Sequence, residues 1–280
     1  MPDSSNTTRI LDLADELTPI ERASVYAIRK TFDVPALHSG VRWLQRKIGS
    51  RWVLVCTDNV RHMHGLSRLP DFDPEKSYIC VANHRSFFDL YVVTAHLIQS
   101  GMHHRILFPV RSGFWYDHPL GPVVNWSMSF LAMYPPVFRK RNRALNIAGV
   151  NEVVELVNRG GTFLGMHPEG RRKLDGDPYT FLPAQPGFGR ILHRTKEKSV
   201  VIPVFINGLV NSIVEQISGN YRGTVPDVHA VFGKPIDFSD LLAQDDVPET
   251  HHAIANRAMS VIADLSKEEQ MIRAGTLSIP

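Results

Sequence analysis

Short apolar runs and longer helical stretches follow one another through most of the chain. Runs rich in β-branched residues predict buried strands at residues 51–56, 77–82, 105–110, 128–134, 161–166 and 199–206. The stretches between them predict helices at residues 87–99, 142–158, 186–196 and 249–266. Strands that alternate with helices are typical of an α/β fold, so we expect a mostly parallel central sheet that is flanked by helices.

The first 50 residues have a different pattern and predict an N-terminal pair of helices. Thr18, Pro19 and Glu21 have the residue types and the spacing of a capping box, which predicts a helix over residues 19–31. Pro35 opens the second helix of the pair. Two parts are therefore expected, a helical extension at residues 1–50 and an α/β domain at residues 51–280.

The second of these helices, expected at residues 35–49, combines an apolar stripe with basic residues. The apolar residues are Trp43, Leu44 and Ile48, and the basic residues are Arg42, Arg46 and Lys47. One interpretation is an amphipathic helix that packs on the main domain. The other is a basic amphipathic contact with a membrane surface.

The composition is that of an ordinary globular protein with a weak positive charge. Hydrophobic residues make up 43% and charged residues 21% of the chain, and the formal net charge is +3. This charge does not indicate a nucleic-acid partner, but it suits an anionic substrate or an anionic membrane surface. The N-terminus lacks the pattern of a signal peptide, and no apolar run is long enough to span a bilayer. We expect a cytoplasmic protein that binds peripherally to the inner face of the cell membrane.

A histidine and an aspartate follow the strand predicted at residues 77–82. His84 lies on the turn after this strand, and Asp89 lies in the first turns of the next helix, for which Ser86 is a plausible N-cap. On one continuous helix these two residues would point about 140° apart, whereas a histidine on the turn can reach the carboxylate. The carboxyl end of a strand is also where open α/β sheets bind ligands.

A His–Asp pair has a chemical use as a general base. Neutral imidazole can take the proton of a hydroxyl that attacks a thioester carbonyl, while the carboxylate fixes the tautomer and stabilises the imidazolium. The alcohol of the substrate is then the nucleophile. With 13 histidines in the chain, this spacing arises about once by chance, so a structural histidine is the alternative.

A second strand, at residues 161–166, is followed by a loop that carries a carboxylate, a glycine and three consecutive cations. The loop residues are Glu169, Gly170, Arg171, Arg172 and Lys173. Because arginine side chains bind phosphate through two parallel hydrogen bonds, this loop predicts a phosphate-binding site. A solvated basic loop is the alternative.

These two segments resemble the first and third signature motifs of the glycerolipid acyltransferases, a family that includes lysophosphatidate and glycerol-3-phosphate acyltransferases. The first motif of that family is Asn-His, four residues, Asp, and the third is Phe-Pro-Glu-Gly-Thr-Arg. Two further segments resemble its second and fourth regions. The four blocks match in order and spacing at residues 83–89, 108–121 with 137–139, 167–172 and 201–204. The resemblance covers roughly residues 55–235.

The resemblance implies a role for each matching residue. His84 matches the general base, and Asp89 matches the carboxylate that orients it. The residues implied in binding the acceptor substrate are Arg111, Arg139, Glu169, Gly170, Arg171 and Arg172. The acyl donor implied by the family is a thioester, either acyl-CoA or acyl carrier protein, and it serves as a co-substrate without a further cofactor.

The chain departs from the family pattern at two places in the third motif. His167 replaces phenylalanine, and Arg171 replaces threonine, so the loop gains a cation and loses a small hydroxyl. This departure bears on the identity of the acceptor more than on the type of reaction. Arg85 and Ser86 inside the first motif resemble the glycerol-3-phosphate branch of the family.

The sequence therefore predicts an O-acyltransferase that acts on a hydroxyl of a phosphate-bearing lipid precursor, most of all 1-acylglycerol-3-phosphate. Other acceptors remain open, namely glycerol-3-phosphate, a lyso-ornithine lipid or a glycolipid. A non-catalytic lipid-binding relative is an alternative of a different class.

Metal chemistry is not expected from the spacing of cysteine and histidine. Cys56 and Cys80 form neither a metal-binding spacing nor a disulfide framework, which indicates reduced thiols. A metal-dependent hydrolase would have to use His103, His104 and His118, which lie in predicted loops without a recognisable ligand frame.

Overall fold

The computed structural model describes residues 8–138, 143–174 and 176–280, and its centre is a seven-stranded sheet. The strands are β1 (Arg61–His64), β2 (Ser77–Ala82), β3 (Arg105–Arg111), β4 (Met133–Val137), β5 (Thr162–Met166), β6 (Ser199–Asn207) and β7 (Val228–Phe232). Their order in the sheet is β1-β7-β6-β2-β5-β3-β4. The pair β6–β7 is antiparallel and the other neighbouring pairs are parallel, which confirms the predicted mostly parallel sheet.

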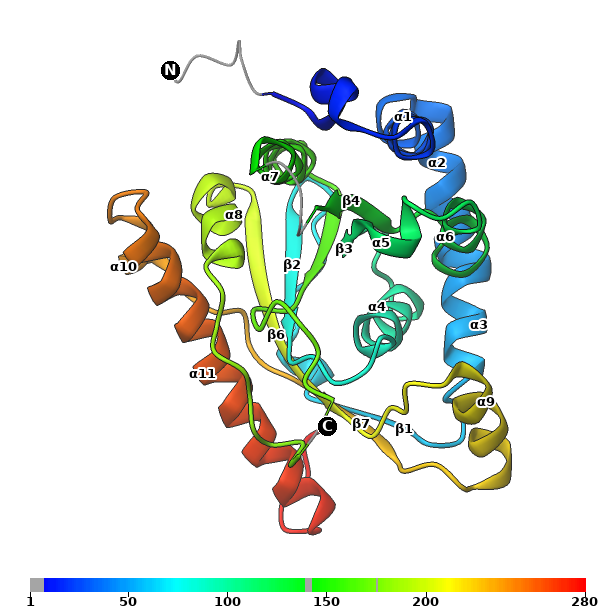
Figure 1. Cartoon of the computed structure of the whole chain (residues 1–280). Helices are drawn as coiled ribbons and strands as arrows, with labels where there is room; N and C mark the ends of the chain where they lie inside the picture. Colours follow the sequence, from blue (N-terminus) through cyan, green and yellow to red (C-terminus); the bar gives the residue numbers. More distant parts are fainter. Residues whose placement is uncertain (1–7, 139–142, 175) are drawn as a thin grey trace.

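Helices cover both faces of this sheet (Figure 1). The helices are η1 (Ile10–Glu16), α1 (Pro19–Asp33), α2 (Pro35–Leu44), η2 (Gln45–Gly49), α3 (Ser50–Val55), η3 (Leu66–Arg68), α4 (Asp89–Gln99), α5 (Ser112–Trp115), α6 (Gly121–Ser129), α7 (Arg143–Asn158), α8 (Gly187–Thr195), α9 (Ile213–Arg222), α10 (Ser239–Leu242) and α11 (Pro248–Arg273). One layer contains α7, α8 and α11, and the other contains α3, α4, α6 and α9. The expected α/β fold with N-terminal helices is therefore confirmed.

The N-terminal helices follow the sequence closely. The Thr18 hydroxyl accepts the backbone N–H of Glu21, and the Glu21 carboxylate accepts the backbone N–H of Thr18, so the predicted capping box is present. From Pro35 the chain stays helical through α2, the π-helical turn η2 and α3. This helical run passes residue 50 without a break. The division into a helical extension at residues 1–50 and an α/β domain at residues 51–280 stays a prediction.

The strand predicted at residues 51–56 is wrong, because these residues belong mainly to α3. A short apolar run fits a buried strand and a half-buried helix equally well. Here the helix buries Val53 and leaves Val55 half exposed. The strand that actually opens the sheet is β1, whose sequence Arg-His-Met-His has no apolar run to reveal it. The strand predicted at 128–134 also begins later, because Ser129 still belongs to α6.

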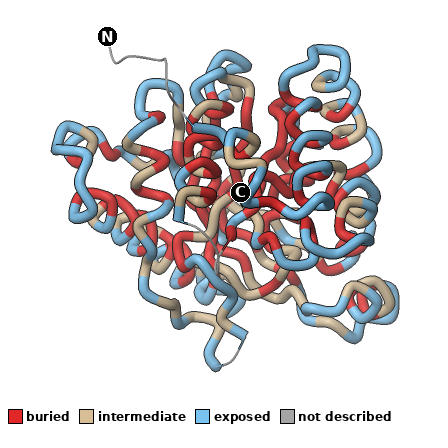
Figure 2. Tube along the Cα trace, turned by 45° about the horizontal axis from the view of Figure 1, so that its top comes forward, coloured by how far each residue is buried: buried red, intermediate tan, exposed pale blue. Residues whose placement is uncertain are grey.

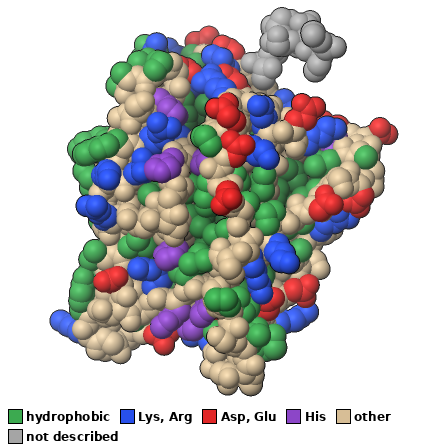
Figure 3. All heavy atoms as spheres, turned by 180° about the vertical axis from the view of Figure 1, so that it is seen from behind, with side chains coloured by type: hydrophobic (Ala, Val, Ile, Leu, Met, Phe, Trp, Pro, Cys, Tyr) green, Lys and Arg blue, Asp and Glu red, His purple; other side chains and the backbone are tan. Residues whose placement is uncertain are grey.

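The core lies on both faces of the central strands. All six residues of β2 are buried, and buried residues concentrate in the sheet and on the inner sides of the helices (Figure 2). The surface in Figure 3 shows basic, acidic and apolar side chains interspersed, in keeping with the small net charge. Within the described ranges, none of the helices has the length and apolar character needed to cross a membrane.

Candidate active site

The loop between β2 and α4 carries the first candidate residues. The helix begins at Asp89, five residues after His84, and its N-cap is Phe88. Ser86 is therefore not the N-cap that the sequence predicts. Instead the Asp89 carboxylate closes the loop by accepting the backbone N–H groups of Arg85 and Ser86, each at 2.8 Å from the Oδ2 atom.

His84 and Asp89 lie in contact, as the sequence predicts. The Nδ1 atom of His84 is 3.3 Å from the Oδ2 atom of Asp89. Burial raises the pKa of the Asp89 carboxyl to about 6, although the two backbone N–H groups and the charge of Arg172 oppose this rise. An ionised carboxylate can only accept hydrogen bonds, so above this pKa Nδ1 of His84 carries the proton and donates. The Nε2 atom is then the unprotonated nitrogen, which can accept a proton.

Glu169 fixes the backbone of the same loop. Its side chain is buried, with Oε1 accepting the backbone N–H of His84 at 2.9 Å and Oε2 accepting that of Leu182 at 2.8 Å. Burial raises the pKa of Glu169, and these two backbone donors counteract the rise. The carboxylate therefore ties the loop after β5 to the loop that carries His84.

His167 stacks directly on His84. The two ring centroids are 3.6 Å apart and the planes differ by 5°. The Nδ1 atom of His167 lies 3.0 Å from the carbonyl oxygen of Ala82 and 2.9 Å from that of Asn83, so this atom carries the proton and donates. Burial and the nearby His84 lower the pKa of His167 to about 3, which keeps the ring neutral. His167, which replaces the phenylalanine of the family motif, is therefore in direct contact with His84.

Two of the three cations in the loop after β5 are exposed, and Lys173 is half-buried. Arg171 and Arg172 both reach solvent, and Nη1 of Arg172 donates to Oδ1 of Asn211 at 3.0 Å. Gly170 has φ +69°, and a Cβ atom there would meet Cγ of Gln185 at 3.0 Å. The loop conformation therefore requires glycine at this position.

Three further arginines belong to the segments that resemble the family motifs. Arg111 is exposed at the carboxyl end of β3, the same edge of the sheet as His84, because β2, β5 and β3 are parallel. Arg139 lies outside the described residues. Arg85 donates to the carbonyl oxygens of Lys173 and Thr180, each at 3.1 Å, and so holds the loop after β5 in place.

A narrow apolar pocket, with a cavity volume of about 20 Å³, opens beside the loop between β2 and α4. It lies between α3, α4 and α9, and its lining includes Trp52, Cys56, Phe87, Phe88, Tyr91 and Ile213. Phe87 and Phe88 belong to the loop that carries His84. The pocket therefore places apolar side chains beside the loop that carries His84.

Two groups of three donors could hold a metal ion within the part of the chain that the structure describes. They are His62–Asp227–His229 and His84–Asp89–His167. The histidines at positions 103, 104 and 118 form no such group among the described residues, and the Nε2 atom of His104 bonds the carbonyl oxygen of Asp73 at 3.1 Å. The metal-dependent hydrolase suggested as an alternative therefore lacks its ligand set in these residues.

The sequence did not predict the residues that hold the loops around His84 and Asp89 in place. Asn211 holds Arg172, and Leu182 holds Glu169, but both contacts join segments that share no local pattern. The position of the aspartate could have predicted one of these contacts. Asp89 is the first residue of α4, and an acidic side chain at a helix start can accept backbone N–H groups of the preceding loop.

Comparison with known proteins gives matches of two kinds, a family model and solved structures. A family model described as Acyltransferase matches residues 60–207. The chain is also similar in fold to the crystal structure of the 1-acyl-sn-glycerophosphate (LPA) acyltransferase, PlsC, from Thermotoga maritima. The identity is 18%, the TM-score is 0.50, and the match covers 92% of this chain and 86% of that chain. No curated protein matches the sequence.

Proposed function

This chain belongs to the acyltransferase family, and on that basis we propose that it moves a fatty acyl chain from a thioester to a hydroxyl of a phosphate-bearing lipid precursor. The observation that carries the proposal is the His84–Asp89 pair, with Nδ1 of the imidazole 3.3 Å from the carboxylate. A donor and an acceptor substrate follow from the family. The choice of 1-acylglycerol-3-phosphate as acceptor, with acyl-CoA or acyl carrier protein as donor, is part of the proposal.

In the proposed reaction the acceptor hydroxyl attacks the thioester carbonyl carbon. The Nε2 atom of His84 takes the hydroxyl proton as the new C–O bond forms. Asp89 stabilises the resulting imidazolium, which is next to a buried carboxylate. The tetrahedral intermediate then expels the thiolate by breaking the C–S bond, and the imidazolium returns the proton to that sulfur. The products are an ester and a free thiol.

Glu169 and His167 act as positioning residues in this proposal. Glu169 holds the backbone N–H of His84, and His167 packs against the face of its ring. Both therefore restrict the rotation of the imidazole. Because each is engaged with the protein, we assign the acceptor phosphate to the exposed arginines Arg172, Arg171 and Arg111, with Arg172 first. Arg139, which lies outside the described residues, stays a further proposed contact.

A turnover assay with a panel of acceptors tests the proposed function directly. The purified protein is supplied with acyl-CoA or acyl carrier protein and with 1-acylglycerol-3-phosphate, glycerol-3-phosphate, a lyso-ornithine lipid or a glycolipid. The proposal is supported if 1-acylglycerol-3-phosphate is the acceptor with the highest kcat/KM. A preference for an acceptor without phosphate would overturn the assignment of the arginines, and no transfer to any acceptor would favour a non-catalytic lipid-binding protein.

Replacing Arg172 with alanine is expected to raise the KM for the acceptor by about tenfold, because a charge-assisted contact to phosphate is lost. The KM for the thioester should change much less. Steady-state kinetics with each substrate varied in turn measure both values. Lys198→Ala is the control, since Lys198 is an exposed cation just before β6, at the opposite end of the sheet. A larger rise in the KM for acyl-CoA would instead assign Arg172 to the donor phosphates.

A membrane contact is proposed at the outer side of α2 and η2. Trp43 is 56% exposed and Ile48 is 45% exposed, whereas Val41 and Gln45 face the core. The helical segment therefore packs on the domain with one side and presents apolar residues to solvent on the other, which supports the proposed membrane contact. Exposed apolar residues continue on the neighbouring α6 and just before it, at Leu120, Val123 and Trp126.

Charge reversal of the basic residues in this segment is expected to weaken binding to anionic vesicles by at least tenfold. The triple variant replaces Arg42, Arg46 and Lys47 with glutamate, and each cation near anionic lipid contributes about 1 kcal/mol. Vesicle co-sedimentation at low and high salt measures the effect, because salt screens such attraction. Lys198 and Lys234, reversed together, are the control. Unchanged sedimentation of the triple variant would contradict a membrane contact at this segment.

A further inference from the structure

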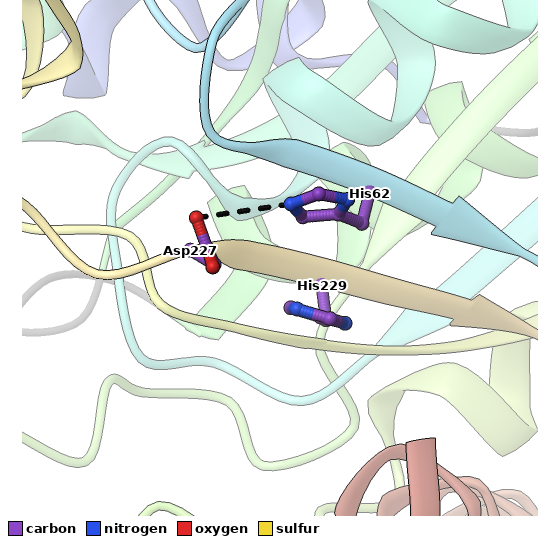
Figure 4. Close-up of side chains that lie close together, drawn as sticks. All are labelled: His62, Asp227 and His229. Carbon is purple, nitrogen blue, oxygen red and sulfur yellow. Dashed lines mark ion pairs between the residues drawn. The ribbon is translucent and has the colours of Figure 1, made fainter. Parts of the chain in front are cut away.

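Four side chains with metal-binding groups gather on one face of the β1–β7 pair. His62 and His64 are two positions apart on β1, and so are Asp227 and His229 at the start of β7. Residues two apart in a strand point to the same face of a sheet. His62 pairs with His229 in the parallel register, and Figure 4 shows these two side chains beside that of Asp227.

The distances are those of a cluster of ligands. One donor atom from each of His62, Asp227 and His229 lies within 4.8 Å of the other two. The Nε2 atom of His62 is 3.7 Å from Oδ1 of Asp227. The ring of His64 stacks on His229, with its Nε2 atom 3.1 Å from Nδ1 of His229.

The charges that border the cluster favour a bound cation. Arg273 is paired with the Glu269 carboxylate and donates to the backbone oxygen of Asp227 at 2.8 Å. The carboxylates of Asp227 and Glu269 therefore outnumber this one cation.

We propose that His62, Asp227 and His229 form a binding site for a divalent transition-metal ion of the Zn²⁺ type, with His64 as an adjacent fourth donor. Neutral imidazoles with one carboxylate are the ligands that Zn²⁺ takes in proteins. Tetrahedral Zn²⁺ with ligands at 2.0–2.1 Å separates ligand atoms by about 3.4 Å. Small rotations of His62 and Asp227, whose side chains are 47% and 58% exposed, bring the donors to that spacing.

This site would join the edge of the sheet to its neighbour. β1 has four residues and lies at one end of the strand order, so few backbone hydrogen bonds hold it. The residue after it, Gly65, donates its backbone N–H to the carbonyl oxygen of Pro280 at 3.0 Å. A metal bridge between β1 and β7 would therefore stabilise both the edge strand and the packing of the chain end. The site is separate from His84, since β6 and β7 lie between β2 and β1.

The test is a titration of the full-length, chelator-treated protein with Zn²⁺ by calorimetry, with Co²⁺ absorption as a second readout of the ligands. We expect one ion per chain at this site and a higher thermal unfolding midpoint when it is bound. Changes around a metal site that spare the ligands already cost 10–100-fold in affinity, so loss of a ligand should cost about 100-fold or more. His229→Ala and Asp227→Asn should both do so.

Two controls separate this site from other histidines. His252→Ala removes an exposed histidine of α11, and His84→Ala removes a donor from the other group of three. Neither change should affect the affinity for Zn²⁺ at the proposed site. The His229 and Asp227 variants should keep the acyl transfer of the unaltered protein, because they lie outside the proposed reaction. Binding that survives His229→Ala, or that disappears in His84→Ala, would overturn the proposal.

Discussion

Replacement of His84 by alanine is expected to lower turnover by about 10²- to 10⁴-fold, the usual range for loss of a general base. The acceptor hydroxyl would then have to lose its proton to solvent as it attacks. Because the His84 side chain is 19% exposed and Glu169 still accepts the backbone N–H at this position, the fold should persist. Saturating kinetics and circular dichroism on the same preparation measure the two properties.

A second variant, His84→Gln, tests the same prediction if the His84→Ala protein does not fold. His84→Gln retains a polar side chain of similar length, so it preserves more of the packing against His167 while it cannot act as the base. Both variants should lose kcat while the KM for each substrate changes little. A well-folded His84→Ala protein with nearly unaltered turnover would contradict the mechanism.

The parts of the fold that the sequence predicted are those whose pattern is local. The strands at residues 77–82 and 199–206 are buried apolar runs, and the capping box at Thr18 is a contact over three residues. β1 was missed because three of its four side chains are polar or charged and its pairing partner lies about 165 residues further along the chain. The run at 51–56 was misassigned because only tertiary packing decides whether it forms a strand or a helix.

The same distinction applies to the site. The pairing of His84 with Asp89 spans five residues, so spacing and a strand end were enough to predict it. Glu169 was predicted as part of a substrate-binding loop, yet its carboxylate reaches back 85 residues to the backbone of His84. Arg85 likewise donates to the loop that follows β5. Such contacts depend on which strands become neighbours, and the sequence gives no local sign of that.

The pKa of Asp89 links the site to stability. Burial raises this pKa from 3.8 to about 6, so between these pH values the unfolded chain releases the proton and the folded protein retains it. The folded state therefore loses stability as the pH rises from about 4 to about 6, and the loss persists at pH 7. A side chain of the same shape that cannot ionise would avoid this cost.

Asp89→Asn is accordingly expected to lower turnover by about 10²- to 10³-fold while it raises the thermal unfolding midpoint at pH 7. The oxygen that faces Nδ1 of His84 also accepts the N–H groups of Arg85 and Ser86, so these donors should hold the amide oxygen of asparagine in the same place. The tautomer of His84 would then be kept, and the lost turnover would reflect the missing negative charge beside the imidazolium.

The pH dependence separates this explanation from a change of tautomer. In the unaltered protein kcat/KM should fall as the pH drops below about 6, where Asp89 becomes protonated. The Asp89→Asn variant should turn over slowly at every pH. Its kcat/KM should lack the part of the decline below about pH 6 that protonation of Asp89 causes. If asparagine instead turned its amide group toward His84, Nδ1 would have to accept, and turnover would fall by about 10⁴-fold. A loss that large, or an unfolding midpoint below that of the unaltered protein at pH 7, would contradict the prediction.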